Sequence, residues 1–236
     1  MANSEHLLAL KGGSAAWNRW RAENPQMRSD FRSADLEGLD LEGANLQGAN
    51  MMDAVLKGTR LPRVDLGRAK LVRADLRGSN LVGSDLSEAK FSGAVLEGAD
   101  LAGAKLVRAE LAGSDLRSLS LAGSDLAGAI LTGADLTGAD LRSARMRGAD
   151  LRRAKLVGAN LSGADLSEAK LVRAKLARAN LAGASLTRAD LSGADLSGAD
   201  LSEADLSGAD ISRADFAFAN LDGAVLEGVR RTDMGF

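Results

Sequence analysis

The chain has 236 residues, of which 45% are hydrophobic and 26% are charged, and its 30 basic and 32 acidic side chains leave a formal net charge of −2. This near balance argues against a general nucleic-acid binder and against a strongly acidic mimic of nucleic acid. With no Cys and a single His, His6, the chain lacks the residues for disulfides, thiolate metal sites or histidine-based catalysis, so we expect no metal or cofactor. No apolar run approaches the roughly 18 residues of a membrane span and no signal sequence is recognisable, so we expect a cytoplasmic protein.

Residues 1–28 precede the repetitive part of the chain and are predicted to form a helical cap on it. Ser4 is the candidate N-cap of a first short helix, and Ser14 is the candidate N-cap of a second, which the following proline ends. The second helix places Trp17 and Trp20 three residues apart on one face. We favour the interpretation that these aromatic side chains pack on the first repeats; the alternative is a tryptophan pair that binds a partner.

A strict five-residue period begins at Phe31 and continues to Leu226 without an insertion or a deletion. Every fifth residue is large and apolar: 34 of the forty are Leu, and 31 of the forty residues two positions earlier are Ala. On an α-helix five residues advance about 140° past a full turn, so the leucines would point in all directions. In a continuous strand an odd period would send successive leucines to opposite faces. Each unit is therefore predicted to be a short extended segment followed by a corner.

Within a unit the small residue and the Leu lie two positions apart, so in an extended segment both point into a shared interior. The residue between them points out and is Asp or Asn in 25 of the forty units, side chains that accept hydrogen bonds in turns. The last two residues, often Ser-Gly, suit a turn with positive φ; where Arg68, Glu88 or Arg108 replaces the Gly, we expect a different turn type. Candidate core residues, spaced twenty apart, are Leu71, Phe91, Leu111, Leu131, Leu151 and Leu171.

The outward charges indicate how many units complete a coil, because residues stacked between coils lie about 4.8 Å apart and favour opposite signs. Among charged pairs at this position, ten of sixteen are opposite in sign at a spacing of 20 residues, against five of sixteen at 15 and seven of eighteen at 25. Four units per coil are therefore predicted. The longest alternating series is Asp85, Lys105, Asp125, Arg145 and Asp165.

Units such as ANLQG at residues 44–48 and ADLTG at residues 134–138 resemble the repeats of the pentapeptide-repeat family, and the resemblance covers residues 29–228. It implies an all-β fold: a right-handed quadrilateral parallel β-helix, a solenoid of about ten coils with four pentapeptides each. The stretch WNRWR, which begins at Trp17, also resembles a leader that precedes some bacterial arrays of this family.

Charge is concentrated in two blocks of the repeats. Between Asp140 and Arg178 ten basic residues stand against four acids, a balance of +6, and residues 188–215 carry seven acids against two bases, a balance of −5. A solvated polar surface is the simplest interpretation of both. The functional interpretation is a basic interaction patch for an acidic protein partner, nucleic acid or an anionic membrane; without interleaved aromatic residues, single-stranded nucleic acid is disfavoured. The ten basic residues are Arg142, Arg145, Arg147, Arg152, Arg153, Lys155, Lys170, Arg173, Lys175 and Arg178.

No enzyme activity and no small-molecule substrate are expected. An interior of Leu and Ala leaves no pocket for paired carboxylates, the Ser and Thr residues have no neighbouring base, and no glycine run matches a phosphate-binding loop. The favoured hypothesis is a structural scaffold that docks a protein partner on its flat charged faces. The resemblance implies an alternative, since one branch of the family resembles duplex DNA, binds DNA gyrase and other type II topoisomerases, and protects them from quinolones. The net charge of −2 and the basic block make this alternative less favoured.

Residues 229–236 form a short C-terminal tail after the last repeat. A parallel β-helix ends in an unpaired edge, which promotes association unless it is covered. Phe218 stands where Gly is usual and is predicted to point outward, and Phe236 ends the tail. Because the resemblance includes family members that dimerise through their C-terminal ends, we predict a tail-to-tail homodimer with Phe218 and Phe236 near the contact.

Overall fold

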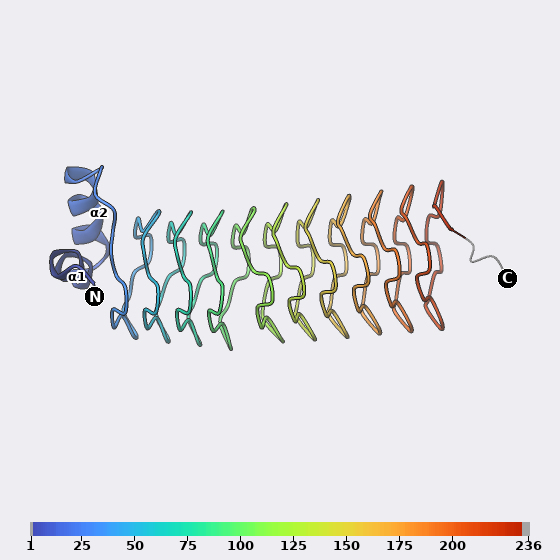
Figure 1. Ribbon diagram of the computed structural model, residues 1–236, viewed down its shortest axis with the longest axis horizontal. Helices are drawn as coiled ribbons and strands as arrows, with labels where there is room; N and C mark the ends of the chain where they lie inside the picture. Colours follow the sequence, from blue (N-terminus) through green and yellow to red (C-terminus); the bar gives the residue numbers. More distant parts are fainter. Residues whose placement is uncertain (1, 233–236) are drawn as a thin grey trace.

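The computed structural model describes residues 2–232 and shows a pair of short helices followed by a long stack of coils (Figure 1). Helix α1 spans Ser4–Lys11 and helix α2 spans Ser14–Glu23, and both lie at the end of the stack where the first coil begins (Figure 1). In the rest of the described chain the extended positions are isolated parallel bridges, and no longer strand forms.

Backbone hydrogen bonds between coils set the register of the stack. The Leu36 N–H donates to the Val55 carbonyl at 2.9 Å, and the Val55 N–H donates to the Ala34 carbonyl at 2.9 Å. The Gly38 N–H adds a third bond, to the Lys57 carbonyl at 3.0 Å. This ladder repeats from unit to unit, and every bridge joins residues twenty apart, so four five-residue units complete one coil.

The interior of the stack is filled by the Leu and the small residue of each unit. These two residues face the same way because they lie two positions apart in an extended segment. Each Leu side chain removed from water contributes about 2 kcal/mol to the folded state. The candidate core residues all lie in this interior and are at most 2% exposed: Leu71, Phe91, Leu111, Leu131, Leu151 and Leu171.

Every unit closes with the same kind of turn, whether or not it contains Gly. The last residue of each unit, two positions after its Leu, has a φ between +54° and +69° throughout the repeats. The different turns expected at Arg68, Glu88 and Arg108 were therefore a wrong prediction, since their φ values are 58°, 59° and 55°. The left-handed conformation costs a non-Gly residue about 1–2 kcal/mol, but it lets the Arg68 N–H donate to the Ser87 carbonyl of the next coil at 2.7 Å. The ladder thus imposes one turn geometry on every side chain.

The outward Asp and Asn side chains support these turns from outside. Asp195 Oδ1 accepts the Ser197 N–H at 3.0 Å and the Ser197 hydroxyl at 2.7 Å, and Asp205 Oδ1 accepts the Ser207 N–H at 2.8 Å. Hydrogen bonds from the serine side chain and backbone favour the charged carboxylate and lower the pKa of Asp195 and of Asp205. The outward carboxylates are therefore part of the fold as well as of the surface.

The N-terminal helices contact the first coil through aromatic side chains. Trp17 is fully buried, stacks on Trp20 at a centroid distance of 5.1 Å and meets Phe31 edge-on at 5.2 Å. His6, to which the sequence assigned no role, is buried beside them, and its Nδ1 accepts the Asp30 N–H at 3.0 Å. These contacts fix the helices on the open end of the stack.

Both helices begin differently from the prediction. The N-cap of α1 is Asn3 and not Ser4; its Oδ1 accepts the N–H groups two and three residues on, at 2.9 and 3.2 Å. The N-cap of α2 is Gly13, with φ of 90° and no side-chain cap, so Ser14 is the first helical residue rather than the cap. The prediction erred because Asn and Gly are also favourable N-caps and each directly precedes a serine here.

The ladder is interrupted at one place within residues 2–232. The bridge that the register places between Val95 and Asp115 is absent, although each residue is bridged normally to the coil on its other side. The two coils stand visibly apart on that side in the green part of the stack (Figure 1). No feature of the five-residue period had predicted this opening.

The inward and outward positions predict opposite outcomes for two adjacent lysine substitutions. Leu131→Lys puts an ammonium group into the dry interior, where an unpaired charge costs roughly several kcal/mol even after the surroundings relax. We therefore expect an insoluble or unfolded protein. Ile130→Lys is the matched control, because Ile130 is 42% exposed and stacks between the acidic Glu110 and Asp150. We expect it to melt within about 3 °C of the wild type by circular dichroism. Equal behaviour of the two variants would contradict the inward assignment.

Acid is expected to destabilise the turns. The pKa values of Asp195, Asp205 and Asp210 lie below the ordinary value, chiefly because serine hydroxyls hydrogen-bond the carboxylates. A depressed folded pKa stabilises the protein above the unfolded pKa of about 3.9, and this stabilisation is lost as pH falls through the folded pKa. Melting temperatures should therefore fall between about pH 5 and pH 2.

The matched variant changes all three aspartates to asparagine, which keeps the hydrogen-bond acceptor and removes the titration. Its melting temperature should fall less steeply over the same pH range. A slope identical to that of the wild type would show that these carboxylates do not stabilise the fold.

Candidate interaction surfaces

The ten residues of the predicted basic patch divide into two equal groups in three dimensions. Five of them form ion pairs and are neutralised locally. Arg142 and Arg152 hydrogen-bond the aspartates two residues before them, which lowers the pKa of Asp140 and Asp150. The five pairs are Arg142–Asp140 at 2.7 Å, Arg145–Asp125 at 3.2 Å, Arg147–Glu168 at 2.9 Å, Arg152–Asp150 at 2.6 Å and Lys155–Asp135 at 3.0 Å.

The other five form no ion pair with any residue of the described chain, and all are exposed. They lie on two adjoining sides of neighbouring coils, because Arg153 and Arg173 are twenty residues apart and Lys175 belongs to the unit that follows Arg173. Lys155 and Lys175 are bridged to one another, a like-charged pair that is unfavourable for the fold. We call this group the basic patch: Arg153, Lys170, Arg173, Lys175 and Arg178.

The acidic block at residues 188–215 has a different character. Its aspartates come from consecutive units, so they surround the stack instead of forming one face. Most accept the N–H of the serine two residues on, as Asp190 does from Ser192 and Asp210 does from Ser212, both at 3.0 Å. These carboxylates support the turns, and they bound the basic patch on its C-terminal side.

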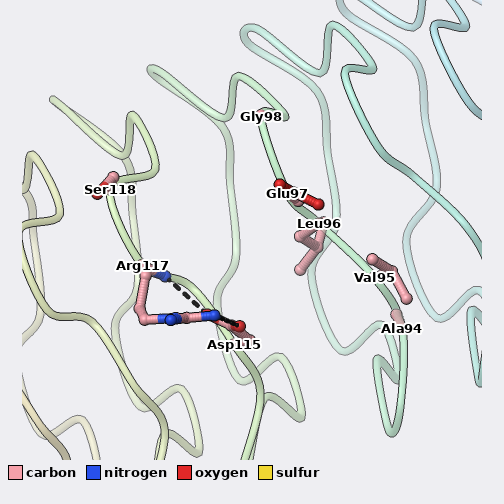
Figure 2. A pocket seen from close by; sticks show the side chains of 8 residues that line it. All are labelled: Ala94, Val95, Leu96, Glu97, Gly98, Asp115, Arg117 and Ser118. Carbon is pink, nitrogen blue, oxygen red and sulfur yellow. Dashed lines mark hydrogen bonds and ion pairs between the residues drawn. The ribbon is translucent and has the colours of Figure 1, made fainter.

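The interruption of the ladder forms a second candidate surface, which we call the slot. It is a cavity of about 620 Å³ between two coils, lined by residues 94–98, Asp115, Arg117 and Ser118 (Figure 2). Five hydrogen bonds that every neighbouring coil makes are missing there. The donor and acceptor pairs are Gly93 and Ala112, Leu96 and Asp115, Gly98 and Arg117, Asp115 and Ala94, and Ser120 and Ala99.

The rim of the slot is partly apolar and partly acidic. Val95 is 44% exposed, and the neighbouring Glu97 is exposed and forms no ion pair with residues 2–232 (Figure 2). On the facing coil Arg117 pairs with Asp115 at 2.6 Å, and its hydrogen bonds lower the pKa of that carboxyl. Two oversized core residues flank the opening, Phe91 on one coil and Leu119 on the next.

The sequence signal for this opening is Leu119. It stands at the small-residue position, which is Ala in 31 of forty units, and is fully inside the stack, 2% exposed. Its N–H bond to the Leu116 carbonyl is 3.4 Å long, against 2.8–3.1 Å in the units with Ala at this position; the bonds of Leu39 and Val64 are also long, at 3.3 Å each. Excess volume in a packed interior forces backbone shifts, so Phe91 and Leu119 together account for the opening.

The predicted C-terminal contact is described only in part. Phe218 is 98% exposed, with φ of 60°, and Val225 nearby is 45% exposed. Phe216 and Leu221 of the last coil are only partly buried, unlike their counterparts in earlier coils. Phe236 lies outside the described residues.

Residues 2–232 contain no group of three or more His, Cys, Asp or Glu side chains arranged to hold a metal ion. None of the helices described is long and apolar enough to cross a membrane.

Comparisons with known proteins agree on the repeat. The model of the family described as pentapeptide repeats matches in eight copies, in overlapping segments that together run over residues 29–228. A search of curated proteins gives no match. Among solved structures, HetL from the cyanobacterium Nostoc sp. strain PCC 7120 is 38% identical with a TM-score of 0.62, over 89% of this chain and 94% of HetL.

Two further solved structures are more distant. A trypsin-treated variant of QnrB1, a plasmid-mediated fluoroquinolone resistance protein, is 26% identical with a TM-score of 0.40 over 76% of this chain and 90% of that one. A pentapeptide repeat protein from the Arabidopsis thaliana thylakoid lumen is 31% identical with a TM-score of 0.34 over 48% of this chain and 71% of that one. The family match over nearly the whole stack, the likeness to HetL and the twenty-residue register together show that this chain belongs to the pentapeptide repeat family and is a right-handed β-helix solenoid.

Proposed function

We propose that this protein is a non-catalytic docking scaffold whose basic patch receives an acidic surface of a partner protein. One observation carries the proposal. Five exposed cations on two adjoining sides of the stack have no ion-pair partner in the described chain, although the protein has 32 acidic residues. Clustered like charges oppose folding. Their concentration on one part of a regular surface is best explained by a partner that neutralises them.

The surroundings of the patch favour a compact acidic partner over an extended polyanion. Arg173 and Lys175 are followed one coil later by Gly193 and Asp195, and the acidic ring of residues 188–215 continues from there. A DNA duplex or an anionic membrane laid along the stack would meet these carboxylates. The patch also contains no aromatic side chain to stack on bases or enter a bilayer interface.

One relative, HetL, has a regulatory role. HetL is described as involved in the regulation of heterocyst differentiation. The alternative of a DNA mimic that binds gyrase would call for a continuous acidic face along the stack. Here Arg145, Lys155 and the basic patch interrupt the acids on several sides, so protein docking through the patch is the better supported proposal.

The exposed end of the stack supports a C-terminal homodimer. Phe218 is almost fully exposed, and beside partly buried Phe216 and Leu221 the last coil has an edge that no residue of 2–232 pairs. A two-fold pairing of such ends would cover both edges at once. This contact would leave the basic patch free on each subunit, so the dimer would present two docking surfaces.

Neutralising the basic patch tests the proposed function. We expect Arg173→Gln, Lys175→Gln and Arg178→Gln together to weaken binding of a 20-residue polyglutamate peptide about tenfold, because each exposed contact is worth roughly 0.5 kcal/mol. The matched control changes Arg142, Arg145 and Arg147 to Gln, which removes the same charge from cations that are already paired. Fluorescence anisotropy at low ionic strength measures both.

Three outcomes would contradict the proposal. Equal loss in the two triple variants would show that only net charge matters. Tighter binding of a 20-base-pair duplex or of phosphatidylserine vesicles than of the peptide would point to nucleic acid or membrane. Inhibition of gyrase supercoiling that survives neutralisation of the patch would favour the topoisomerase alternative.

The dimer is tested by light scattering. Wild type should give about twice the chain mass of 24.4 kDa, and Phe218→Asp should give a single chain mass. Val82→Asp is the matched control, since Val82 is an exposed apolar residue, 37% accessible, far from the C-terminal end of the stack. A monomeric wild type at tens of micromolar, or a dimer that survives Phe218→Asp, would overturn the proposed contact.

A further inference from the structure

The slot between residues 94–98 and 114–118 is not used by the proposed docking of an acidic partner, and it offers different chemistry. We propose that it binds an extended peptide segment of a partner protein, which fills the opening and takes up the backbone hydrogen bonds that the ladder lacks there. This site is independent of the basic patch. Within residues 30–230 it is the place where two facing segments of neighbouring coils, at Val95 and Asp115, are not bridged.

The backbone groups on the two edges are complementary to an inserted strand. In every neighbouring coil, the groups equivalent to the Leu96 and Gly98 N–H donate to the next coil, and here they have no backbone partner. The backbone groups of the facing edge are unpaired as well, since the Asp115 carbonyl accepts no ladder bond and the Asp115 N–H donates none. Unpaired backbone donors and acceptors in strand register are the recognition elements by which sheets capture extended peptides.

The size of the opening suits a short segment. Its volume of about 620 Å³ lies within the range of roughly 300–1,000 Å³ typical of ligand-binding pockets. The base of the opening is apolar, since it is formed by Ala94 and Leu96, which are nearly or fully buried in the core. Ser118 and Gly98 lie at the end of the opening, where Figure 2 shows no bulky side chain.

The side chains on the rim indicate the chemistry of the segment. Glu97 forms no ion pair with residues 2–232, because Arg77 and Arg117, twenty residues before and after it, are each paired with an aspartate two residues earlier. Val95, two residues before Glu97, exposes an apolar side chain. An extended segment has a side-chain period of two. The favoured occupant therefore carries Lys or Arg two positions from Val, Ile or Leu.

The opening is built into the core and does not depend on a ligand. Phe91 and Leu119 lie in successive coils on either side of it, so their extra volume acts between those coils. The first coil holds a comparable pair, Phe31 and Leu39, but its ladder to the second coil is intact. There Leu39 is only partly buried, whereas Leu119 is 2% exposed, and Phe31 packs on Trp17 of the N-terminal helices.

Residue-resolved hydrogen exchange on the full chain tests the slot itself. The amides of Leu96, Gly98 and Asp115 should exchange at least about a hundredfold faster than the equivalent amides one coil later, Leu116, Ser118 and Asp135, which donate ladder bonds. Protection equal to that of the later coil would show that the ladder is continuous and would overturn the proposal.

Peptide selection tests the docking. Random heptapeptides displayed on phage are selected on the wild-type protein, and the enriched sequences are made as synthetic peptides. We expect enrichment of a basic residue two positions from an aliphatic one, and protection of the Leu96, Gly98 and Asp115 amides when a peptide binds. Enriched peptides that leave these amides unprotected, or no enrichment at all, would overturn the proposal.

Two variants test whether the core volume opens the slot and whether Glu97 selects the peptide. Leu119→Ala removes the excess core volume, so it should slow exchange at the Leu96 amide and weaken peptide binding at least about tenfold. Glu97→Gln alters only an exposed side chain, so it should fold normally and weaken only peptides that carry the basic residue. If both variants bind the peptides as the wild type does, the slot is not the docking site. Because the basic patch is unchanged in both, polyglutamate binding should be unaffected, which separates this outcome from failure of the proposed function.

Discussion

The backbone hydrogen bonds between successive coils are the interaction on which the rest of the structure depends. They join residues twenty apart, and through the five-residue period they place the Leu of each unit before the last coil inside and the Asp or Asn that precedes it outside. They are strong enough collectively to hold seventeen non-Gly residues at positive φ, among them Arg68 and Glu88. Fifteen of them donate a ladder bond that offsets this local conformational cost; Arg213 and Phe218, near the last coil, donate none.

The same register decides which surface charges are neutralised. Arg145 lies twenty residues after Asp125 and pairs with it, whereas Lys175 lies twenty residues after Lys155 and has no acid on that side. The balance of +6 over residues 140–178 therefore overstates the available positive charge before Arg153, where most cations are paired. Most of the unpaired cations lie between Lys170 and Arg178. The surface that results is a compact basic area bounded by an acidic ring, which suits a partner of limited size.

Much of the fold followed from the sequence, because a period of five that never slips leaves few arrangements for the Leu and Ala residues. The turn at Arg108 was mispredicted because the local preference of Arg against positive φ was weighed without the hydrogen bond that its N–H donates to the Ala127 carbonyl, at 3.0 Å. Helix starts erred by one residue, at Asn3 and Gly13, where neighbouring residues are nearly equivalent caps.

The candidate surfaces were less predictable than the fold. Which of the ten cations are paired depends on side chains that reach between coils, as in Arg147–Glu168, and the linear balance of charge does not contain that information. The slot escaped notice because Leu119 and Phe91 each look like a tolerable variation within a unit. Their effect arises because they lie in different units of consecutive coils, where both volumes act on the same pair of coils.

Inserting a single neutral unit tests most directly the claim that the register of the ladder assembles the docking surface. The sequence ANLSG of residues 159–163 is placed either after Arg173 or, as a control of identical composition and charge, after Gly133. With four units per coil, the first insertion moves Lys175 and Arg178 to the side opposite Lys170 and Arg173, while the second leaves the basic patch intact. Both proteins should keep the wild-type circular dichroism spectrum, and only the first should lose affinity for polyglutamate, by about tenfold. Equal affinity of the two, or unfolding of either, would contradict the account.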